Sequence, residues 1–295
     1  MYTAMKAHIF PGQGTQFPGM ARDLYDKSPT TRCYFDQAKH ILGFDIADAM
    51  FNGTAGTLKE TNVAQPAIFL HSVVAAFATP ERPDMVAGHS LGELSALVVA
   101  DVLSFQEGLW LVNKRAAAMQ RACEASDSTM AVVLGLSPEI IDTLCPGLSG
   151  DVVVAANYNA PEQTVISGTH QGITTATLLL KKAGAKMVMP LAVRGGFHSP
   201  LMEEAKIEFE QAVASVSFRR PTCPVYQNVD GVATEHIDKI KRNIVRQLTH
   251  PVQWTQTIRQ MVEDGASAFV EFGPKRVLSG LVRRIIGQDT VSIAA

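Results

Sequence analysis

The feature that most constrains the fold is a turn at residues 86–97, VAGHSLGELSAL, where an apolar run passes directly into a helix-like run. Its centre, GHSLG, holds Ser90 between two glycines. Glycines on both sides remove the side chains that would clash in a sharp turn, and such a turn lifts a serine hydroxyl above the edge of a sheet. The pattern therefore predicts a strand, a tight turn and a helix in immediate succession.

The segments before this turn show the same alternation of strand and helix. Residues 6–10, KAHIF, are typical of a buried strand, and a Gly/Pro-rich loop leads from them into a helix predicted over 21–42. Another helix is predicted over 63–78, with Pro66 near its first turn, where proline is tolerated. Alternating strands and helices predict a mainly parallel sheet covered on both faces.

The pattern changes over residues 128–193, where a strand, a helix, two closely spaced strands, a helix and a strand follow one another. This βαββαβ order is the ferredoxin-like arrangement and predicts a small inserted subdomain. We therefore expect a large domain made of residues 1–127 and 194–295, and a small subdomain made of residues 128–193. Within the large domain, one long helix is predicted over 244–265.

Composition narrows the class of protein. The chain has 295 residues, of which 46% are hydrophobic and 18% charged, with a formal net charge of -2, as in ordinary soluble globular proteins. This balance argues against nucleic acid as a main partner. The four cysteines lack the spacing of a metal site or disulfide framework, and no segment has the length of a membrane span or the pattern of a signal peptide. We expect a cytoplasmic protein without a metal or a membrane partner.

The serine turn carries the first candidate chemistry. Ser90 is a candidate nucleophile, and the amide of Leu91, at the start of the following helix, is free to donate to an oxyanion. A serine hydroxyl needs a base, and His198 in the Gly-rich stretch GGFHSP is the best candidate because such a loop lets a polar side chain reach a cleft. We expect His89 to point the other way in the turn. No aspartate is obvious as a third member, so a backbone carbonyl or an amide could orient the imidazole instead.

Arg115 is the other informative residue. Ser104 and Glu107 form a capping-box pattern ahead of its helix, and small side chains surround it in KRAAAMQ. An arginine fixed near an acyl nucleophile suits a substrate with a free carboxylate, which a guanidinium can bind with two parallel hydrogen bonds. The alternative is an ordinary surface arginine on an amphipathic helix.

Eight stretches over the whole chain carry a family resemblance. In order they are FPGQGTQFPGM, TNVAQPAIF, VAGHSLGELSAL, KRAAAMQ, NYNAPEQTVISG, GGFHSPLM, QLTHPVQW and VEFGPKRVLSGL. Together they resemble the malonyl-CoA:acyl carrier protein transacylases and the acyltransferase domains of polyketide synthases. The resemblance implies an α/β-hydrolase-like core with a parallel sheet, plus the inserted ferredoxin-like subdomain.

The resemblance also implies roles for individual residues. Ser90 would be the acylated nucleophile, His198 its base, and Gln247 the residue whose carbonyl orients the histidine. The oxyanion hole would consist of Gln13 and the amide of Leu91. The side chains expected around the substrate are Arg115, Phe197, Asn157, Asn159 and His89. Within this set Phe197 agrees with the pattern of malonyl-selective members.

The implied reaction is a ping-pong transfer of malonyl from malonyl-CoA to the phosphopantetheine thiol of an acyl carrier protein, without a cofactor, by a monomer. Fatty acid synthesis of the dissociated type is the first expectation, and a free-standing acyltransferase of a polyketide synthase is the alternative. An acyl hydrolase would share the serine turn, although it has no need of Arg115. A non-catalytic subunit that binds carrier protein would be expected to lack Ser90 or His198, and the chain has both.

Overall fold

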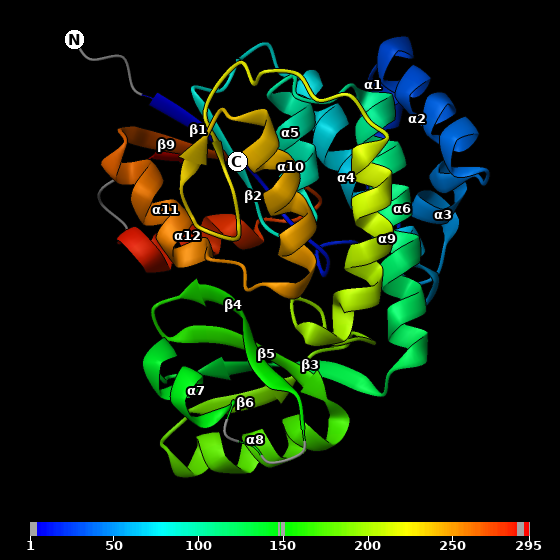
Figure 1. Ribbon diagram of the computed structural model, residues 1–295. Helices are drawn as coiled ribbons and strands as arrows, with labels where there is room; N and C mark the ends of the chain where they lie inside the picture. The colour runs from blue at the N-terminus through cyan, green and yellow to red at the C-terminus, as the bar shows by residue number, and fades with distance from the viewer. Residues whose placement is uncertain (1–4, 147, 149–150, 288–291, 295) are drawn as a thin grey trace.

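The computed structural model describes residues 5–146, 148, 151–287 and 292–294, and it contains two sheets (Figure 1). The six strands of the larger sheet have the order β10-β9-β1-β2-β7-β8. They are parallel except for the antiparallel pair β7 and β8. Their bounds are β1 (Met5–Phe10), β2 (Met85–Gly88), β7 (Val225–Tyr226), β8 (Ala233–Thr234), β9 (Ala266–Glu271) and β10 (Ser292–Ala294).

Helices cover both faces of this sheet. Side chains alternate along β1, so that Ile9 packs toward α11 and α12 while Phe10 packs into the larger core formed with α2, α4, α5, α6 and α9. The helical segments are α1 (Arg22–Lys27), α2 (Pro29–Leu42), α3 (Ile46–Asn52), η1 (Thr57–Lys59), α4 (Thr61–Phe77), α5 (Gly92–Val99), α6 (Phe105–Ala125), η2 (Pro200–Met202), α9 (Glu203–Ala214), α10 (Ile237–Arg246), η3 (Gln247–Thr249), α11 (Trp254–Glu263) and α12 (Val277–Ile286).

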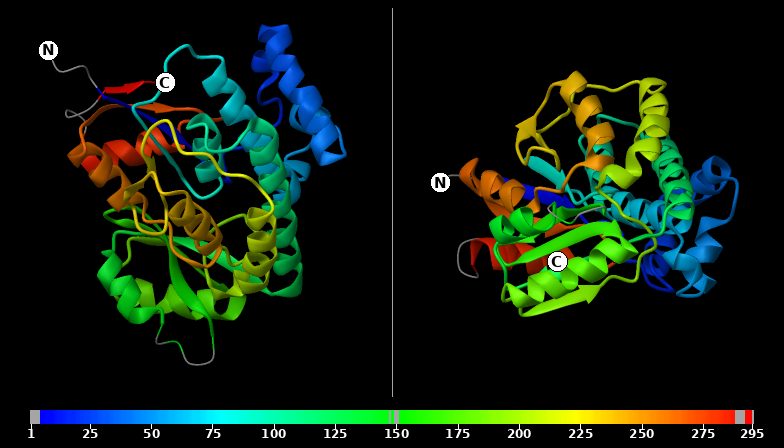
Figure 2. Two further views of the ribbon diagram at one scale, coloured as in Figure 1. Left: turned by 45° about the horizontal axis from the view of Figure 1, so that its top comes forward. Right: turned by 60° about the horizontal axis from the view of Figure 1, so that its bottom comes forward.

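The smaller sheet is antiparallel, with the strand order β4-β5-β3-β6. It lies with its two helices below the larger sheet in Figure 1, and it lies in front of the larger part in the right view of Figure 2. The chain order is β3 (Ser128–Leu134), α7 (Pro138–Leu144), β4 (Val153–Ala160), β5 (Gln163–Thr169), α8 (His170–Lys182) and β6 (Met187–Pro190). This βαββαβ order beside a mainly parallel sheet confirms the predicted fold class.

Strand β4 connects the two parts through the segment that precedes α11. The Val252 amide donates to the Ala156 carbonyl at 2.9 Å, and the Tyr158 amide donates to the Val252 carbonyl at 2.9 Å. The Thr255 hydroxyl donates to the Tyr158 carbonyl at 3.0 Å. These bonds hold one edge of the small sheet against the larger part of the molecule.

Two predicted helices are interrupted. The helix expected over 21–42 divides into α1 and α2 at Ser28, whose side chain caps α2 while Pro29 takes its first position. The helix expected over 244–265 divides into α10, η3 and α11, because Pro251 has no amide hydrogen and disfavours helical backbone in the residue before it. The second division places Gln247 at the start of the short 3₁₀ helix η3 rather than inside an α-helix.

The expectation for Pro66 was also wrong. Helix α4 begins at Thr61, so Pro66 lies inside the helix rather than near its first turn. A proline there removes one internal hydrogen bond. The residue before Pro66 is Gln65, which is buried and accepts a hydrogen bond from Arg115.

Candidate active site

Ser90 occupies the turn between β2 and α5 in a strained conformation. Its φ is 54°, in the left-handed region that few non-glycine residues adopt. The flanking glycines are required sterically: a Cβ at Gly88 would lie 1.9 Å from the Gly92 carbonyl carbon, and a Cβ at Gly92 would lie 2.0 Å from the Phe10 carbonyl oxygen. The turn therefore presents the serine hydroxyl at the carboxyl end of β2.

His198 lies in the loop after β6, and the residue is 3% exposed. Its Nε2 is 2.8 Å from Ser90 Oγ, and its Nδ1 is 2.8 Å from the backbone carbonyl oxygen of Gln247. A nitrogen that faces a carbonyl must carry the hydrogen, so Nε2 is left as the acceptor for the serine proton. Burial, and then the charge of Arg115, lower the pKa of His198 to about 3, which keeps the imidazole neutral.

Arg115 is a buried residue, 1% exposed on α6, and not an ordinary surface arginine. Its Nη2 donates to Ser90 Oγ at 3.2 Å and to Gln247 Oε1 at 2.9 Å. Its Nη1 donates to Gln65 Oε1 at 2.8 Å. Burial lowers the pKa of Arg115 to about 10, so the guanidinium still carries its charge at neutral pH. The arrangement fixes one cation directly beside the serine oxygen.

The groups predicted for an oxyanion hole lie beside the same turn. The Leu91 amide has no acceptor among the described residues, and it stands at the beginning of α5. Gln13 is half-buried in the loop after β1. This loop contacts the serine turn closely, because a Cβ at Gly12 would lie 2.6 Å from the His89 carbonyl oxygen.

The structure places the remaining predicted residues in the serine turn, on β4 and in the loop of His198. His89 points away from Ser90, as expected: its Nε2 is 2.8 Å from Asn159 Oδ1 and its ring meets Trp254 edge-on at 5.4 Å. Asn157, also on β4, is buried and pairs through its backbone with the segment before α11. Phe197 is buried in the hydrophobic core beside His198.

Sequence reasoning missed three buried polar residues that hold the site together. Gln65 binds Arg115 through its side-chain oxygen. Asn228 accepts from the Ser90 amide at 2.6 Å and donates to the Gly88 carbonyl at 2.6 Å. Glu93, fully buried on α5, accepts from the side chain of Gln247. A carboxylate within the apolar stretch GELSALVV was the one signal that could have pointed to Glu93.

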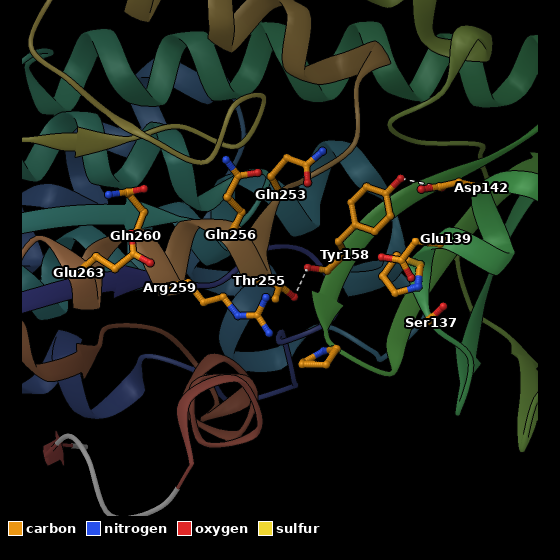
Figure 3. Close-up of a pocket in the computed structure, with 12 residues that line it drawn as sticks. Ser137, Glu139, Asp142, Tyr158, Gln253, Thr255, Gln256, Arg259, Gln260 and Glu263 are labelled. Atoms are coloured by element: carbon orange, nitrogen blue, oxygen red, sulfur yellow. Dashed lines mark hydrogen bonds between the residues drawn. The ribbon is translucent and has the colours of Figure 1, made fainter.

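A large cavity in the structure lies elsewhere. It has a volume of about 680 Å³ and is bounded by α7, β4 and α11 (Figure 3). Tyr158 lines it and donates to Asp142 at 2.7 Å, and Arg259 also lines it. Tyr158 is the neighbour of Asn157 and Asn159 on β4, and adjacent strand residues face opposite sides of a sheet. None of the three central residues, Ser90, His198 and Arg115, lines this cavity.

Two general features of the described residues bear on cofactors and membranes. No cluster of three or more His, Cys, Asp or Glu side chains in this part of the chain could hold a metal ion. None of its helices is both long enough and apolar enough to span a bilayer.

A serine in a strained strand-to-helix turn, hydrogen-bonded to a neutral histidine at the carboxyl end of a parallel sheet, is the arrangement typical of serine enzymes that form acyl intermediates. The chain belongs to the acyl transferase domain family, whose model matches residues 7–293. It is an acyltransferase.

Individual relatives agree with this family. The chain is 41% identical over 282 residues to a malonyl CoA-acyl carrier protein transacylase of Staphylococcus aureus, covering 95% of this chain and 92% of the relative. A malonyl CoA-acyl carrier protein transacylase of Coxiella burnetii has a similar solved structure, with a TM-score of 0.94, 35% identity and coverage of 98% and 93%. A malonyl-transacylase solved in complex with its type II PKS acyl-carrier protein has a TM-score of 0.94, 37% identity and coverage of 99% and 96%.

Proposed function

We propose that this enzyme transfers the malonyl group of malonyl-CoA to the phosphopantetheine thiol of an acyl carrier protein through a malonyl ester on Ser90. The proposal rests on the contacts among Ser90, His198 and Arg115, together with the activity that the names of the relatives state. Type II fatty acid synthesis is the proposed destination of the product. The relative solved with a polyketide-type carrier keeps a free-standing polyketide acyltransferase as the second candidate.

In the first half-reaction Ser90 Oγ attacks the thioester carbonyl while its proton passes to His198 Nε2. The new C–O bond leaves negative charge on the carbonyl oxygen, which the Leu91 amide and Gln13 would stabilise as an oxyanion hole. Collapse of this intermediate breaks the C–S bond, and His198 returns the proton to sulfur, so that CoA leaves as a thiol. Malonyl-Ser90 remains on the enzyme.

In the second half-reaction the carrier thiol replaces CoA. His198 removes the thiol proton, sulfur attacks the malonyl ester, and the proton returns to Ser90 Oγ as the C–O bond breaks. Both half-reactions use only groups of this chain and its two substrates, so the proposal includes no metal and no cofactor. It also treats the enzyme as a cytoplasmic monomer.

The observation that carries the choice of substrate is the buried guanidinium of Arg115, 3.2 Å from Ser90 Oγ. A malonyl group bound to Ser90 has a free carboxylate that this cation can bind, whereas a simple ester substrate has none. The neutral Gln247 carbonyl behind His198 supports the same substrate, because a carboxylate there would add a negative charge beside the malonyl anion. Phe197, Asn157, Asn159 and His89 complete the proposed surroundings of the substrate.

Intact-mass spectrometry after brief exposure to malonyl-CoA or acetyl-CoA tests the proposal. We expect a malonyl adduct on the wild-type chain, no adduct on Ser90→Ala, and a preference for acetyl in Arg115→Ala. Addition of holo acyl carrier protein should discharge the adduct to the carrier. Free malonate accumulating in place of an adduct would instead identify a hydrolase.

A further inference from the structure

Glu93 is a buried acid that the proposed reaction does not use. It lies on α5, three residues after Ser90, and its side chain is 0% exposed. Burial raises its pKa to about 7, although hydrogen bonds from its neighbours oppose the shift. A carboxylate in such a place is costly unless it is fully hydrogen-bonded, so its partners indicate what it does.

The hydrogen-bond partners of Glu93 in the described chain are all donors. Glu93 Oε1 accepts from Gln227 Nε2 at 3.0 Å. Glu93 Oε2 accepts from the Asn228 amide at 2.8 Å and from Gln247 Nε2 at 3.0 Å. A carboxylate is an acceptor at both oxygens, and this set of partners requires an acceptor at both.

The bond to Gln247 helps to determine which way that side-chain amide faces. Gln247 Nε2 donates to Glu93 Oε2 and to the Ser90 carbonyl, each at 3.0 Å, so its Oε1 is turned to Arg115, whose Nη2 donates to it at 2.9 Å. A flipped amide would bring NH₂ against the guanidinium, two donors face to face, and the Arg115 contact would be lost. Arg115 Nη2 is the same group that reaches Ser90 Oγ.

We propose that Glu93 is a positioning residue that holds the Gln247 side chain so that its oxygen fixes Arg115 beside Ser90. This inference rests on the proposed function, because it assigns Glu93 to the selection of a carboxylate-bearing acyl group. The histidine contact does not depend on this amide, since His198 binds the backbone carbonyl of Gln247. Loss of Glu93 should therefore lower the rate of malonyl transfer more than it lowers the intrinsic reactivity of Ser90.

The test compares Glu93→Gln with Glu271→Gln. Glu271 is also a buried carboxylate with three donors, the amides of Leu278 and Ser279 and the Ser279 hydroxyl, and these donors lie outside the active site. Three quantities are measured for each variant: the rate of malonyl-enzyme formation, the rate of acetyl-enzyme formation, and labelling of Ser90 by an uncharged alkyl fluorophosphonate. Labelling reports the serine and histidine without the carboxylate, and it also shows that the variant is folded.

For Glu93→Gln we expect the malonyl-to-acetyl ratio to fall about tenfold, which is the difference between a charge-assisted and a neutral hydrogen bond, while Ser90 labelling stays within about threefold of wild type. Glu271→Gln should leave the ratio unchanged. Glu93→Asp keeps an acceptor-only carboxylate and should restore part of the malonyl-to-acetyl ratio. If Glu93→Gln does not fold, Glu93→Asp is the variant compared with wild type.

A double-mutant cycle with Gln247→Met separates positioning from general destabilisation. The methionine removes the amide but keeps the backbone carbonyl that binds His198. If Glu93 acts through the amide, Glu93→Gln should lower the malonyl-to-acetyl ratio little further in the Gln247→Met background. If the two substitutions act independently, their effects on the ratio should add. An unchanged malonyl-to-acetyl ratio in every folded Glu93 variant would overturn the inference, while absence of a malonyl adduct on the wild-type chain would contradict the proposed function itself.

Discussion

At the scale of the single residue, the site depends on keeping His198 neutral in a buried position next to a cation. The low dielectric around the ring disfavours imidazolium, and Arg115 disfavours it further. The Gln247 carbonyl supplies the orienting hydrogen bond without supplying a countercharge. As the proposed base, His198 is therefore weak, but it is in its neutral form over a wide pH range.

This environment predicts an unusual pH dependence. Protonation inactivates the base only below its pKa, which is lowered from 6.5 to about 3, so labelling of Ser90 by an uncharged fluorophosphonate should stay level as pH falls from about 8 to about 5. Replacing Arg115 with methionine removes a cation and should move the acidic limb to higher pH. An inflection near pH 6.5 in the wild-type chain, with tryptophan fluorescence still native, would contradict the prediction.

The loop that carries His198 allows a second residue-scale prediction. Gly195 has a φ of 140°, and a Cβ there would lie 2.2 Å from Cys123 Sγ. Gly195→Ala should therefore displace the loop and slow Ser90 labelling by at least about tenfold. Gly184→Ala is the matched control, because Gly184 has a φ of 103° but open space around its Cα. Equal labelling by the two variants would show that the loop tolerates the added methyl group.

Sequence analysis selected residues with a reactive or charged side chain in a distinctive pattern, and it missed the buried residues that hold those side chains in place. Ser90, His198 and Arg115 could be selected because each combines a reactive or charged side chain with a distinctive local pattern. Asn228 lies far along the chain from Ser90, and nothing in its sequence neighbourhood shows that the two meet. The role of Glu93 on α5 could be inferred only from its contact with Gln247, which the sequence does not show.

At the scale of the element, α6 positions Arg115 and is fixed at its N-terminus. Ser104 accepts from the Glu107 amide and Glu107 accepts from the Ser104 amide, which confirms the predicted capping box. Local signals of this kind could be interpreted because both partners lie within one turn. The interruptions of the helices at Ser28 and Pro251 were missed because the apolar pattern continues across them.

The cap gives a stability prediction. Ser104→Ala should lower the free energy of unfolding by about 1 kcal/mol while leaving malonyl-enzyme formation unchanged, because Arg115 lies about three turns away. Ser137 precedes α7 but its side chain makes no capping bond, so Ser137→Ala should lower the free energy of unfolding by less than Ser104→Ala does. Urea titrations of both variants measure the difference, and equal losses would argue against a contribution from the cap.

At the scale of the whole molecule, the candidate site depends on both sheets. Strand β4 of the small sheet supplies Asn159, which holds His89. Ser128, at the start of β3, accepts from the Gly195 amide through its carbonyl and from the Gly196 amide through its hydroxyl. The boundaries predicted from the sequence, 1–127 with 194–295 and 128–193, therefore place residues that support the candidate site in both parts.

This dependence predicts that the two parts unfold together. Both tryptophans, Trp110 and Trp254, lie outside residues 128–193, so their fluorescence reports mainly on the large part, whereas circular dichroism reports on both parts. The bonds between β4 and the segment before α11 should make both signals and Ser90 labelling change at one urea concentration. Thr255→Val removes one of these bonds and should lower that midpoint for all three. If labelling fails at lower urea than fluorescence in the wild-type chain, the small sheet unfolds independently. Its contacts with the segment before α11 and with the His198 loop then contribute less to cooperativity than the geometry implies.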